Sequence, residues 1–397
     1  MTQDESGDEP QRPLATNTRL VAAGREPPAY HGFVNTPIFR GSTILYESAE
    51  AFMQRKVRYT YGTRGTPTVD ALERAWSELS GAVGTVVVPS GLAAISLALL
   101  SCLKAGDHLL VTDSVYRPTR NFCDTVLKRF GVETTYYDPL VGAQIGASMR
   151  PNTRAVFTET PGSQSFEMQD VPAIAAAAHQ RDALVLLDNT WATPLYFPPH
   201  ERGADLVIEA GTKYLSGHSY LLLGLVSASE CSWRMLRQTF DAMAICAGPE
   251  DVFLALRGLR TLSVRLAHHQ KSALRMARWF AERPEVLRVL HPGLETDPGH
   301  ALWKRDFRGA SGLFSIVLKP VPQGAAYAFV DALKLFGIGA SWGGFESLVI
   351  PFDCASYRTA TPWAPGGPTL RFHIGLEDTD DLIADLENAF GRLKTAA

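Results

Sequence analysis

Cysteine is scarce in this sequence, and long apolar runs are missing altogether. The five cysteines are scattered through 397 residues, and none of them belongs to a Cys-x-x-Cys pair. An odd number of cysteines without such spacing argues against a disulfide framework and against a thiolate zinc site, so we expect reduced thiols in a cytoplasmic protein. No apolar stretch reaches the roughly 20 residues of a membrane-spanning helix, which predicts that the protein does not act in a membrane.

Two common nucleotide-binding motifs are missing as well. The sequence contains neither Gly-x-Gly-x-x-Gly nor Gly-x-x-x-x-Gly-Lys-[Ser/Thr], which disfavours a dinucleotide site and a P-loop. Its 38 basic and 41 acidic residues nearly balance, so no basic excess favours a nucleic-acid partner. What remains is a chain of globular composition that is long enough for two or three domains.

A regular alternation of strand-like and helix-like segments fills the middle of the chain. Short apolar runs bounded by turn residues are typical of buried strands, and here they alternate with amphipathic segments. The predicted strands are 85–88, 108–112, 132–137, 154–160, 184–188 and 206–210, and the predicted helices are 69–80, 92–105, 118–130 and 171–180. This alternation predicts an α/β domain with a doubly wound parallel sheet at residues 69–260.

The two ends of the chain differ from this middle part. Residues 1–68 are rich in turn residues and aromatics, and we expect a disordered acidic tail followed by an arm that packs on another part of an assembly. Toward the C-terminus the pattern predicts a long helix (259–284), antiparallel strands and a capped C-terminal helix (378–393). The predicted strands of this part are 312–320, 346–352 and 370–376. We therefore predict a smaller α+β domain at residues 261–397.

An acid and a lysine follow two neighbouring strands of the predicted sheet. The apolar run Leu184–Leu187 leads into Asp188, and the run Leu206–Ala210 leads to Lys213. Taken singly, the acid is more often a turn residue and the lysine a solvated charge. Ligands of parallel sheets bind at the carboxyl ends of the strands, so both side chains are expected at one edge. A lysine that forms a Schiff base and an acid that pairs with a pyridinium nitrogen are what pyridoxal 5'-phosphate (PLP) requires.

Three further positions could contribute to the same site as Asp188 and Lys213. The segment Ser90–Leu92 joins a strand to a helix and could hold a phosphate by its backbone N–H groups, although an N-capping serine is the simpler explanation. Tyr116 follows the strand 108–112 and could stack on a flat ring or fill the core. Arg371 on the strand 370–376 could clamp a carboxylate, although the alternating pattern alone favours an exposed surface. His218 has no second ligand at a suitable spacing, so no metal site is predicted.

Together with these residues, several longer motifs resemble the Cys/Met-metabolism family of PLP enzymes. The motifs are YGTRGTPT (61–68), PSGLAAI (89–95), GDHLLVTDSVYRPT (106–119), LLDNTWATP (186–194), TKYLSGHS (212–219), LRGLRTLSVRL (256–266), SWGGFESL (341–348) and LRFHIGLED (370–378). The resemblance covers nearly everything after residue 16. The resemblance implies the aspartate aminotransferase-like fold type I, with an arm, a large cofactor domain and a small C-terminal domain. It also implies a homotetramer built as a dimer of dimers.

The resemblance also implies roles for individual residues. Lys213 is implied to be the Schiff-base lysine, Asp188 the partner of the pyridinium nitrogen, and Tyr116 the residue that stacks on the ring. The implied phosphate ligands are the backbone of Gly91 and Leu92 together with Thr212, and the implied substrate-binding residues are Ser341, Trp342 and Arg371. Tyr61 resembles a catalytic tyrosine that one subunit donates to its neighbour.

Three positions depart from the family pattern. The family usually has an arginine two residues after the donated tyrosine; here that position is Thr63, and the implied cation for the neighbour's phosphate is Arg64. Ala210 replaces a serine three residues before the Schiff-base lysine, and Tyr220 replaces an aspartate after Gly-His-Ser. Because each exchange removes or moves a polar group, all three bear on cofactor affinity.

The implied activity is cleavage of a carbon–sulfur bond at the β-carbon of an amino acid. The segments 116–118, 188–191 and 341–347 resemble bacterial β-cleaving members, and γ-acting relatives usually carry a smaller residue in place of Trp342. We therefore expect cleavage of L-cystathionine to homocysteine, pyruvate and ammonia in methionine biosynthesis. A γ-lyase or γ-synthase relative and a PLP-binding regulatory protein without turnover are the alternatives. The choice among cystathionine, cystine and cysteine as the physiological substrate stays open.

Overall fold

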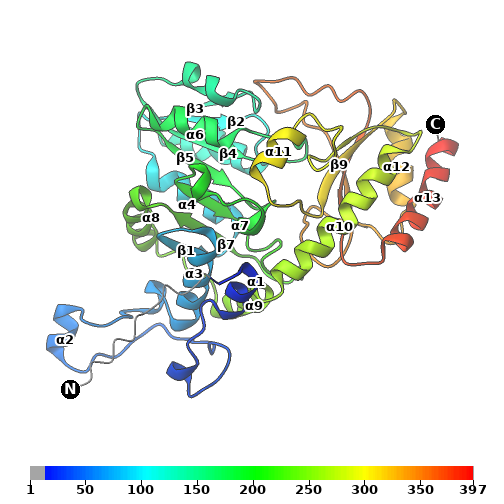
Figure 1. Cartoon of the computed structure of the whole chain (residues 1–397). Helices are drawn as coiled ribbons and strands as arrows, with labels where there is room; N and C mark the ends of the chain where they lie inside the picture. Colours follow the sequence, from blue (N-terminus) through cyan, green and yellow to red (C-terminus); the bar gives the residue numbers. More distant parts are fainter. Residues whose placement is uncertain (1–13, 397) are drawn as a thin grey trace, which may run out of the picture.

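The computed structural model describes the backbone of residues 14–396 and the side chains of residues 14–393. The tail expected at the N-terminus (residues 1–13) lies outside the described residues. Figure 1 shows a large α/β lobe, a smaller lobe beside it and an N-terminal arm that projects away from both. The predicted boundary at residue 260 falls in the short link between α9 (Pro249–Leu259) and α10 (Leu262–Ala281).

A seven-stranded sheet in the order β1-β7-β6-β5-β4-β2-β3 is the framework of the large lobe. Its strands are β1 (Gly84–Val88), β2 (His108–Thr112), β3 (Glu133–Tyr137), β4 (Thr153–Glu159), β5 (Leu184–Asp188), β6 (Leu206–Glu209) and β7 (Gly224–Ala228). The strands β2 to β6 are mutually parallel, as predicted. One further strand was not predicted: β7 lies between β1 and β6 and runs antiparallel to both. Its sequence, GLVSA, has too few large apolar side chains to be predicted as a strand.

Helices cover both faces of this sheet (Figure 1). They are α3 (Pro67–Ser80), α4 (Gly91–Cys102), α5 (Arg117–Phe122) with a π-helical continuation at Cys123–Leu127, α6 (Val171–His179), α7 (Thr193–Tyr196), α8 (Glu230–Met243) and α9, with 3-10 turns at Gly142–Ser148 and His200–Arg202. The four predicted helices are confirmed. The start of α3 is capped by Thr66, whose side chain accepts from the N–H of Val69, and its end is at Gly81 in the left-handed region (φ 71°).

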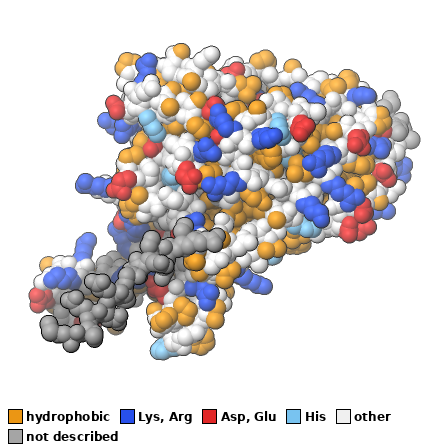
Figure 2. Space-filling view, in the orientation of Figure 1, with side chains coloured by type: hydrophobic (Ala, Val, Ile, Leu, Met, Phe, Trp, Pro, Cys, Tyr) orange, Lys and Arg blue, Asp and Glu red, His pale blue; other side chains and the backbone are white. Residues whose placement is uncertain are grey.

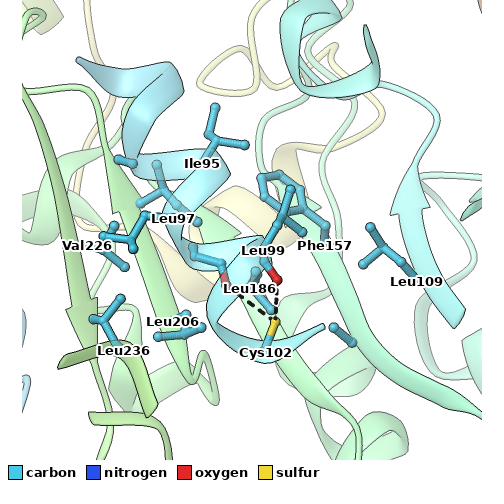
Figure 3. Packing of buried hydrophobic residues seen from close by; sticks show 14 of the residues in the cluster. Ile95, Leu97, Leu99, Cys102, Leu109, Phe157, Leu186, Leu206, Val226 and Leu236 are labelled. Atoms are coloured by element: carbon cyan, nitrogen blue, oxygen red, sulfur yellow. Dashed lines mark hydrogen bonds between the residues drawn. The ribbon is translucent and has the colours of Figure 1, made fainter. Parts of the chain in front are cut away.

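The helix α4 is apolar on almost every side because it packs against both the sheet and α8. Leu97, Leu186, Leu206 and Val226 are fully buried in one cluster around it (Figure 3). Burying a leucine of this size stabilises the fold by about 1.5–3 kcal/mol. This packing fixes the start of α4, and with it the turn after β1, at the carboxyl edge of the sheet.

The smaller lobe is built on a five-stranded sheet in the order β10-β11-β12-β9-β8. Its elements are α10, β8 (Val286–Leu290), α11 (His300–Asp306), β9 (Leu313–Leu318), α12 (Gln323–Asp331), β10 (Gly337–Ile338), β11 (Leu348–Phe352), β12 (Thr369–His373) and α13 (Thr379–Ala396). The three predicted strands are confirmed as the antiparallel neighbours β11, β12 and β9. Phe280, Phe314 and Phe372 interlock in the core between this sheet and the helices.

The N-terminal arm exposes an unusual amount of apolar surface. It contains α1 (Thr16–Ala22), a 3-10 turn at Pro27–Tyr30, α2 (Ala49–Gln54) and a 3-10 turn at Gly62–Arg64. Phe33, Val34, Leu45, Phe52 and Met53 are all more than half exposed. Hydrophobic side chains gather on the lower projection of the molecule, which is part of the arm (Figures 1 and 2). Surface of this kind favours a packing partner.

Candidate active site

A cavity of about 240 Å³ lies at the carboxyl edge of the large sheet. Residues of both lobes line it: Ser90, Gly91, Leu92, Tyr116, Glu159, Asp188, Thr190, Thr212 and Lys213 come from the large lobe, and Ala340, Trp342 and Arg371 come from the small one. Most of the predicted site residues therefore meet in one place. Their convergence follows from the parallel strands, whose carboxyl ends share one edge.

Lys213 lies in the tight turn after β6, where its N–H donates to the carbonyl of Ala210. Its Nζ donates to the Oγ of Ser341 at 2.8 Å and lies 5.3 Å from the ring centre of Trp342. Burial, together with the positive charge of Arg371, lowers the pKa of Lys213 to about 8 against the opposing effect of Asp188. Much more of this amine is uncharged at neutral pH than of a solvated lysine, so it can act as a nucleophile and as a base.

Asp188 ends β5 and is held by a single neighbour, Thr190. The Oδ1 atom of Asp188 accepts from the N–H of Thr190 at 3.0 Å and from its hydroxyl at 2.6 Å. Both of these hydrogen bonds use one oxygen, which leaves Oδ2 for a ligand. Burial raises the pKa of Asp188 despite these bonds. A cationic ring nitrogen placed against the carboxyl group would favour its charged form.

Glu159 is a site residue that the sequence analysis missed. It lies directly opposite Asp188 in the register of β4 and β5, and its Oε2 accepts from the backbone N–H of Tyr116 at 2.8 Å. Burial and the charge of Asp188 raise the pKa of Glu159 well above its usual range, although the N–H of Tyr116 opposes this. The signal that could have found it is its position near the end of a predicted strand, the same signal that identified Asp188.

The start of α4 forms a cradle suited to a phosphate. The Ser90 side chain caps the helix by accepting from the N–H of Ala93, as the simpler explanation predicted. The N–H groups of Gly91 and Leu92 at the helix start remain for an anion, where the helix dipole also favours negative charge. A Cβ on Gly91 would lie 2.8 Å from the Cβ of Ala210, so Ala210 packs closely against the start of α4. Ala210, which replaces the serine usual in the family, therefore forms one wall of the cradle.

Thr212 is oriented differently from what its predicted role needs. Its hydroxyl donates to the carbonyl of Leu223 at 3.2 Å and accepts from the N–H of the same residue at 3.0 Å. The hydroxyl proton therefore points to Leu223, and a bond to a phosphate requires the hydroxyl to rotate. The residue still lines the cavity next to Lys213.

Replacing Gly224 by alanine is expected to disturb this cradle specifically. The added Cβ would lie 2.2 Å from the carbonyl oxygen of Ser90, a backbone atom that cannot move without shifting the start of α4. We expect a loss of about 1–3 kcal/mol in the free energy of unfolding, measured by urea denaturation, together with weaker PLP binding. Gly391→Ala in α13 is the matched control, because its Cβ meets no atom within 4 Å and alanine favours a helix. Equal stability of the two variants would contradict the expected clash.

Arg371 is buried, contrary to the surface position that the alternating pattern favoured. Only 6% of it is exposed, because the second face of β12 turns toward the large lobe and not toward solvent. Its Nη2 donates to the carbonyls of Ala340 and Ser341, at 3.0 and 3.4 Å. No acidic side chain among residues 14–393 forms an ion pair with it. Burial lowers the pKa of Arg371 to about 10, so it stays charged at pH 7 and offers a site for an anionic ligand.

Tyr116 and Trp342 present aromatic surface to the cavity from opposite lobes. Tyr116 caps α5 and is 44% exposed, so the alternative that it fills the core is wrong. Trp342 packs against Tyr214, with 5.5 Å between the ring centres. The exposed face of Tyr116 can stack on a flat ring, and the surface of Trp342 across the cavity can contact an aliphatic chain.

Tyr61 and Arg64 are not brought to Lys213 within one chain. They line a second cavity of about 350 Å³ under the arm, together with Thr63. Arg64 forms an ion pair with Asp241 at 3.1 Å, and Tyr61 is 49% exposed. Tyr220 also lies away from the main cavity, exposed and with its ring beside His218. Among the residues that line the main cavity, the only cations are thus Lys213 and Arg371.

Other kinds of site find no support in the described structure. Between residues 14 and 393 no three His, Cys, Asp or Glu side chains are grouped so that they could hold a metal ion. None of the described helices combines the length and apolarity that crossing a membrane requires. His218 makes the expected local hydrogen bond, to the carbonyl of Ser216. All five cysteines are free thiols.

Comparison with known proteins identifies the family to which the chain belongs. The family model of the Cys/Met metabolism PLP-dependent enzymes matches residues 17–391. The chain belongs to this family. It is 52% identical over 378 residues to a protein of Rhizobium johnstonii named putative cystathionine beta-lyase, covering 94% of this chain and 95% of the relative. It is 42% identical over 388 residues to cystathionine beta-lyase MetC of Escherichia coli, covering 95% and 98%.

A solved structure of the family confirms the fold. The cystathionine gamma synthase of Xanthomonas oryzae pv. oryzae, determined in complex with cystathionine, superposes with a TM-score of 0.89 at 33% identity, covering 97% of this chain and 100% of that one. The fold is therefore the predicted fold type I, with its mixed sheet in the large lobe. As in other members of this PLP-dependent family, PLP is the cofactor.

The geometry of the cavity fits that cofactor. A helix start with small neighbours suits the phosphate, a partly desolvated lysine suits the aldehyde, and a buried carboxyl group with one unused oxygen suits the ring nitrogen. An amino acid bound beside them would find the unpaired guanidinium of Arg371 for its carboxylate. The arrangement can therefore bind an amino acid at its carboxylate while a base acts on its α-carbon.

Proposed function

We propose that this protein is a PLP-dependent cystathionine β-lyase that cleaves L-cystathionine to homocysteine, pyruvate and ammonia in methionine biosynthesis. The observation that carries the proposal is the meeting of Lys213, Asp188 and Arg371 in one cavity whose wall includes Trp342. Relatives at 42–52% identity that bear this name support it. A PLP-binding regulator without turnover is disfavoured, because the lysine, the acid and the arginine of the proposed reaction are all present in the cavity.

Arg371 and Ser341 hold the substrate. The guanidinium pairs with the α-carboxylate by two parallel hydrogen bonds, and its own bond to Ala340 keeps it in orientation. Tyr116 would cover one face of bound PLP, and Asp188 would keep its ring nitrogen charged. Fixing the carboxylate would orient the α-carbon toward the amine of Lys213.

Lys213 moves the protons. Its amine removes the proton from Cα, which its pKa of about 8 permits at neutral pH. When bound, PLP supplies the electron sink into which the charge developing at Cα is delocalised. The Cβ–S bond then breaks, the lysine returns a proton to the sulfur, and homocysteine leaves. Water converts the remaining three-carbon unit to pyruvate and ammonia.

A second copy of the chain completes the site in this proposal. Among residues 14–393, the only cations that line the main cavity are Lys213 and Arg371, and both have other tasks in the proposed reaction. Tyr61 and Arg64 lie on an arm with exposed apolar surface. Two copies that exchange arms would bring Tyr61 to the neighbour's catalytic lysine and Arg64 to its phosphate, after release of Arg64 from Asp241. The homotetramer and the cytoplasmic location belong to the same proposal, and the five free thiols support the location.

The decisive experiment is to identify the keto acid formed from L-cystathionine. Purified, PLP-loaded protein is expected to release pyruvate and homocysteine, both identified by mass. Formation of 2-oxobutyrate and cysteine would instead mean γ-cleavage, and no keto acid would favour the regulatory alternative. L-Cystine and L-cysteine at matched concentrations would rank the substrates that the sequence leaves open.

A further inference from the structure

The loop between β10 and β11, residues 339–347, has no regular secondary structure. It places Trp342 in the wall of the cavity and the hydroxyl of Ser341 against the amine of Lys213. Each of its ends is anchored by side chains of other elements. The carbonyl of Ala340 accepts from Arg371, and the N–H and hydroxyl of Ser347 both donate to Glu377. The central turn, Gly343–Gly344, needs an anchor of its own, because it determines where Trp342 lies.

Gly343 lies directly against the backbone of the catalytic lysine. A Cβ at this position would lie 2.9 Å from the Cα and the carbonyl carbon of Lys213 and from the backbone N of Tyr214. Its φ of 85° is also in the region that favours glycine. The turn therefore leaves no room for a side chain between itself and the backbone of Lys213, and a small displacement of the turn moves Trp342 relative to the amine.

His373 bridges the two glycines of this turn. Its Nε2 accepts from the N–H of Gly343 at 3.1 Å and also lies 3.1 Å from the carbonyl oxygen of Gly344. The residue lies on β12 two positions after Arg371, so both side chains point toward the large lobe, and only 1% of His373 is exposed. The same strand thus supplies the carboxylate clamp and a contact to the turn.

The surroundings of His373 keep its imidazole neutral. Burial, together with the positively charged or chargeable His269, Arg371 and Lys213 around it, lowers its pKa well below the ordinary value, although the contact with Gly344 opposes this. Tyr214 is the other side chain packed against it, with 6.0 Å between the ring centres. A neutral ring can accept from Gly343, whereas a protonated ring has no acceptor.

We propose that His373 is a positioning residue that holds the Gly343–Gly344 turn and thereby sets Trp342 and Ser341 against Lys213. The proposal rests on the proposed β-lyase function for its consequence, since it makes His373 a determinant of how efficiently and at which carbon the substrate is cleaved. His373 itself does not contact the reacting atoms in this proposal; it acts through the loop.

Two substitutions separate this role from simple packing. Glutamine places an amide atom where Nε2 lies, whereas asparagine reaches only as far as Nδ1, an atom without a hydrogen-bond partner in the described structure. In the cofactor-free protein, hydrogen exchange of the Gly343 amide is expected to be slow for wild type and His373→Gln and at least about tenfold faster for His373→Asn. In the loaded enzyme, kcat/KM for L-cystathionine is expected to fall at least tenfold for His373→Asn and by less than threefold for His373→Gln.

Several outcomes would overturn the proposal. An unprotected Gly343 amide in wild type would do so without any variant, so the test survives even if a variant fails to fold. Equal exchange rates and equal kinetics of the two variants would show that His373 only fills space. If wild-type protein makes no pyruvate but the exchange pattern is as expected, the proposed function fails while the positioning role of His373 stands.

Discussion

Replacing Lys213 by alanine is expected to lower kcat for L-cystathionine by about 10,000-fold or more. Lys213 is the only lysine among the described residues that line the cavity, and in the proposed function it is both the covalent link to the cofactor and the base for the α-carbon. The visible absorbance of the lysine-bound cofactor should disappear at the same time. Initial rates of pyruvate release and absorbance spectra of protein reconstituted with PLP measure the two effects.

The control for this variant is Lys271→Ala, an exposed lysine on α10. It should leave the rate and the spectrum unchanged, since a solvated charge contributes little. The thermal midpoint of Lys213→Ala should not fall far below wild type, because removing a partly desolvated amine leaves only the hydroxyl of Ser341 without its donor. A Lys213→Ala protein that keeps both the spectrum and pyruvate release would refute the assignment of this lysine.

The central pair of the site, Asp188 and Lys213, could be predicted from the sequence because both residues follow the ends of strands. Asp188 and Lys213 each follow an apolar run, and parallel strands place their carboxyl ends at one edge, so no structure was needed to bring them together. Glu159 also lies at the carboxyl end of a parallel strand, but the sequence analysis did not select it. An acid near a strand end can be assigned to a site only when the strand beside it is known, and here that neighbour carries Asp188. Which residues of neighbouring strands lie side by side depends on the folded sheet, and this pairing cannot be predicted from a single sequence.

The position of Arg371 shows a different limit. Alternation along β12 correctly separates the apolar face from the face of Arg371 and His373, but period-two alternation cannot say whether the second face meets water or another lobe. The large lobe covers that face, and burial makes the guanidinium a ligand site and not a solvated charge. Tertiary packing therefore decided what the local pattern left open.

The contributions of Tyr61 and Arg64 stay predictions for a related reason. Within one chain these residues line a different cavity, and Arg64 is paired with Asp241. The resemblance implied a neighbour's site for both, which a single copy can neither fulfil nor contradict. The exposed apolar side chains of the arm are the feature of this chain that favours such a neighbour.

The second large effect is expected for Arg371→Ala, and it should appear chiefly in KM. The variant loses a buried guanidinium that has no protein carboxylate as partner, so the charge-assisted bonds it offers belong to the ligand. Two such bonds are worth about 3 kcal/mol or more, which corresponds to roughly a 100-fold rise in KM. Steady-state kinetics with L-cystathionine, and the concentration of alanine needed to perturb the cofactor spectrum, measure the loss independently.

Two matched variants locate the cause of that effect. Arg371→Lys keeps the charge but not the planar fork, so its KM should lie between those of wild type and Arg371→Ala. Arg288→Ala, an exposed arginine on β8 of the same sheet, should leave KM unchanged. Because Arg371 also donates to the carbonyl of Ala340, kcat should fall somewhat as the loop with Trp342 loosens. An unchanged KM in Arg371→Ala would mean that the α-carboxylate is held elsewhere, and the orientation of the substrate in the proposed reaction would have to be reversed.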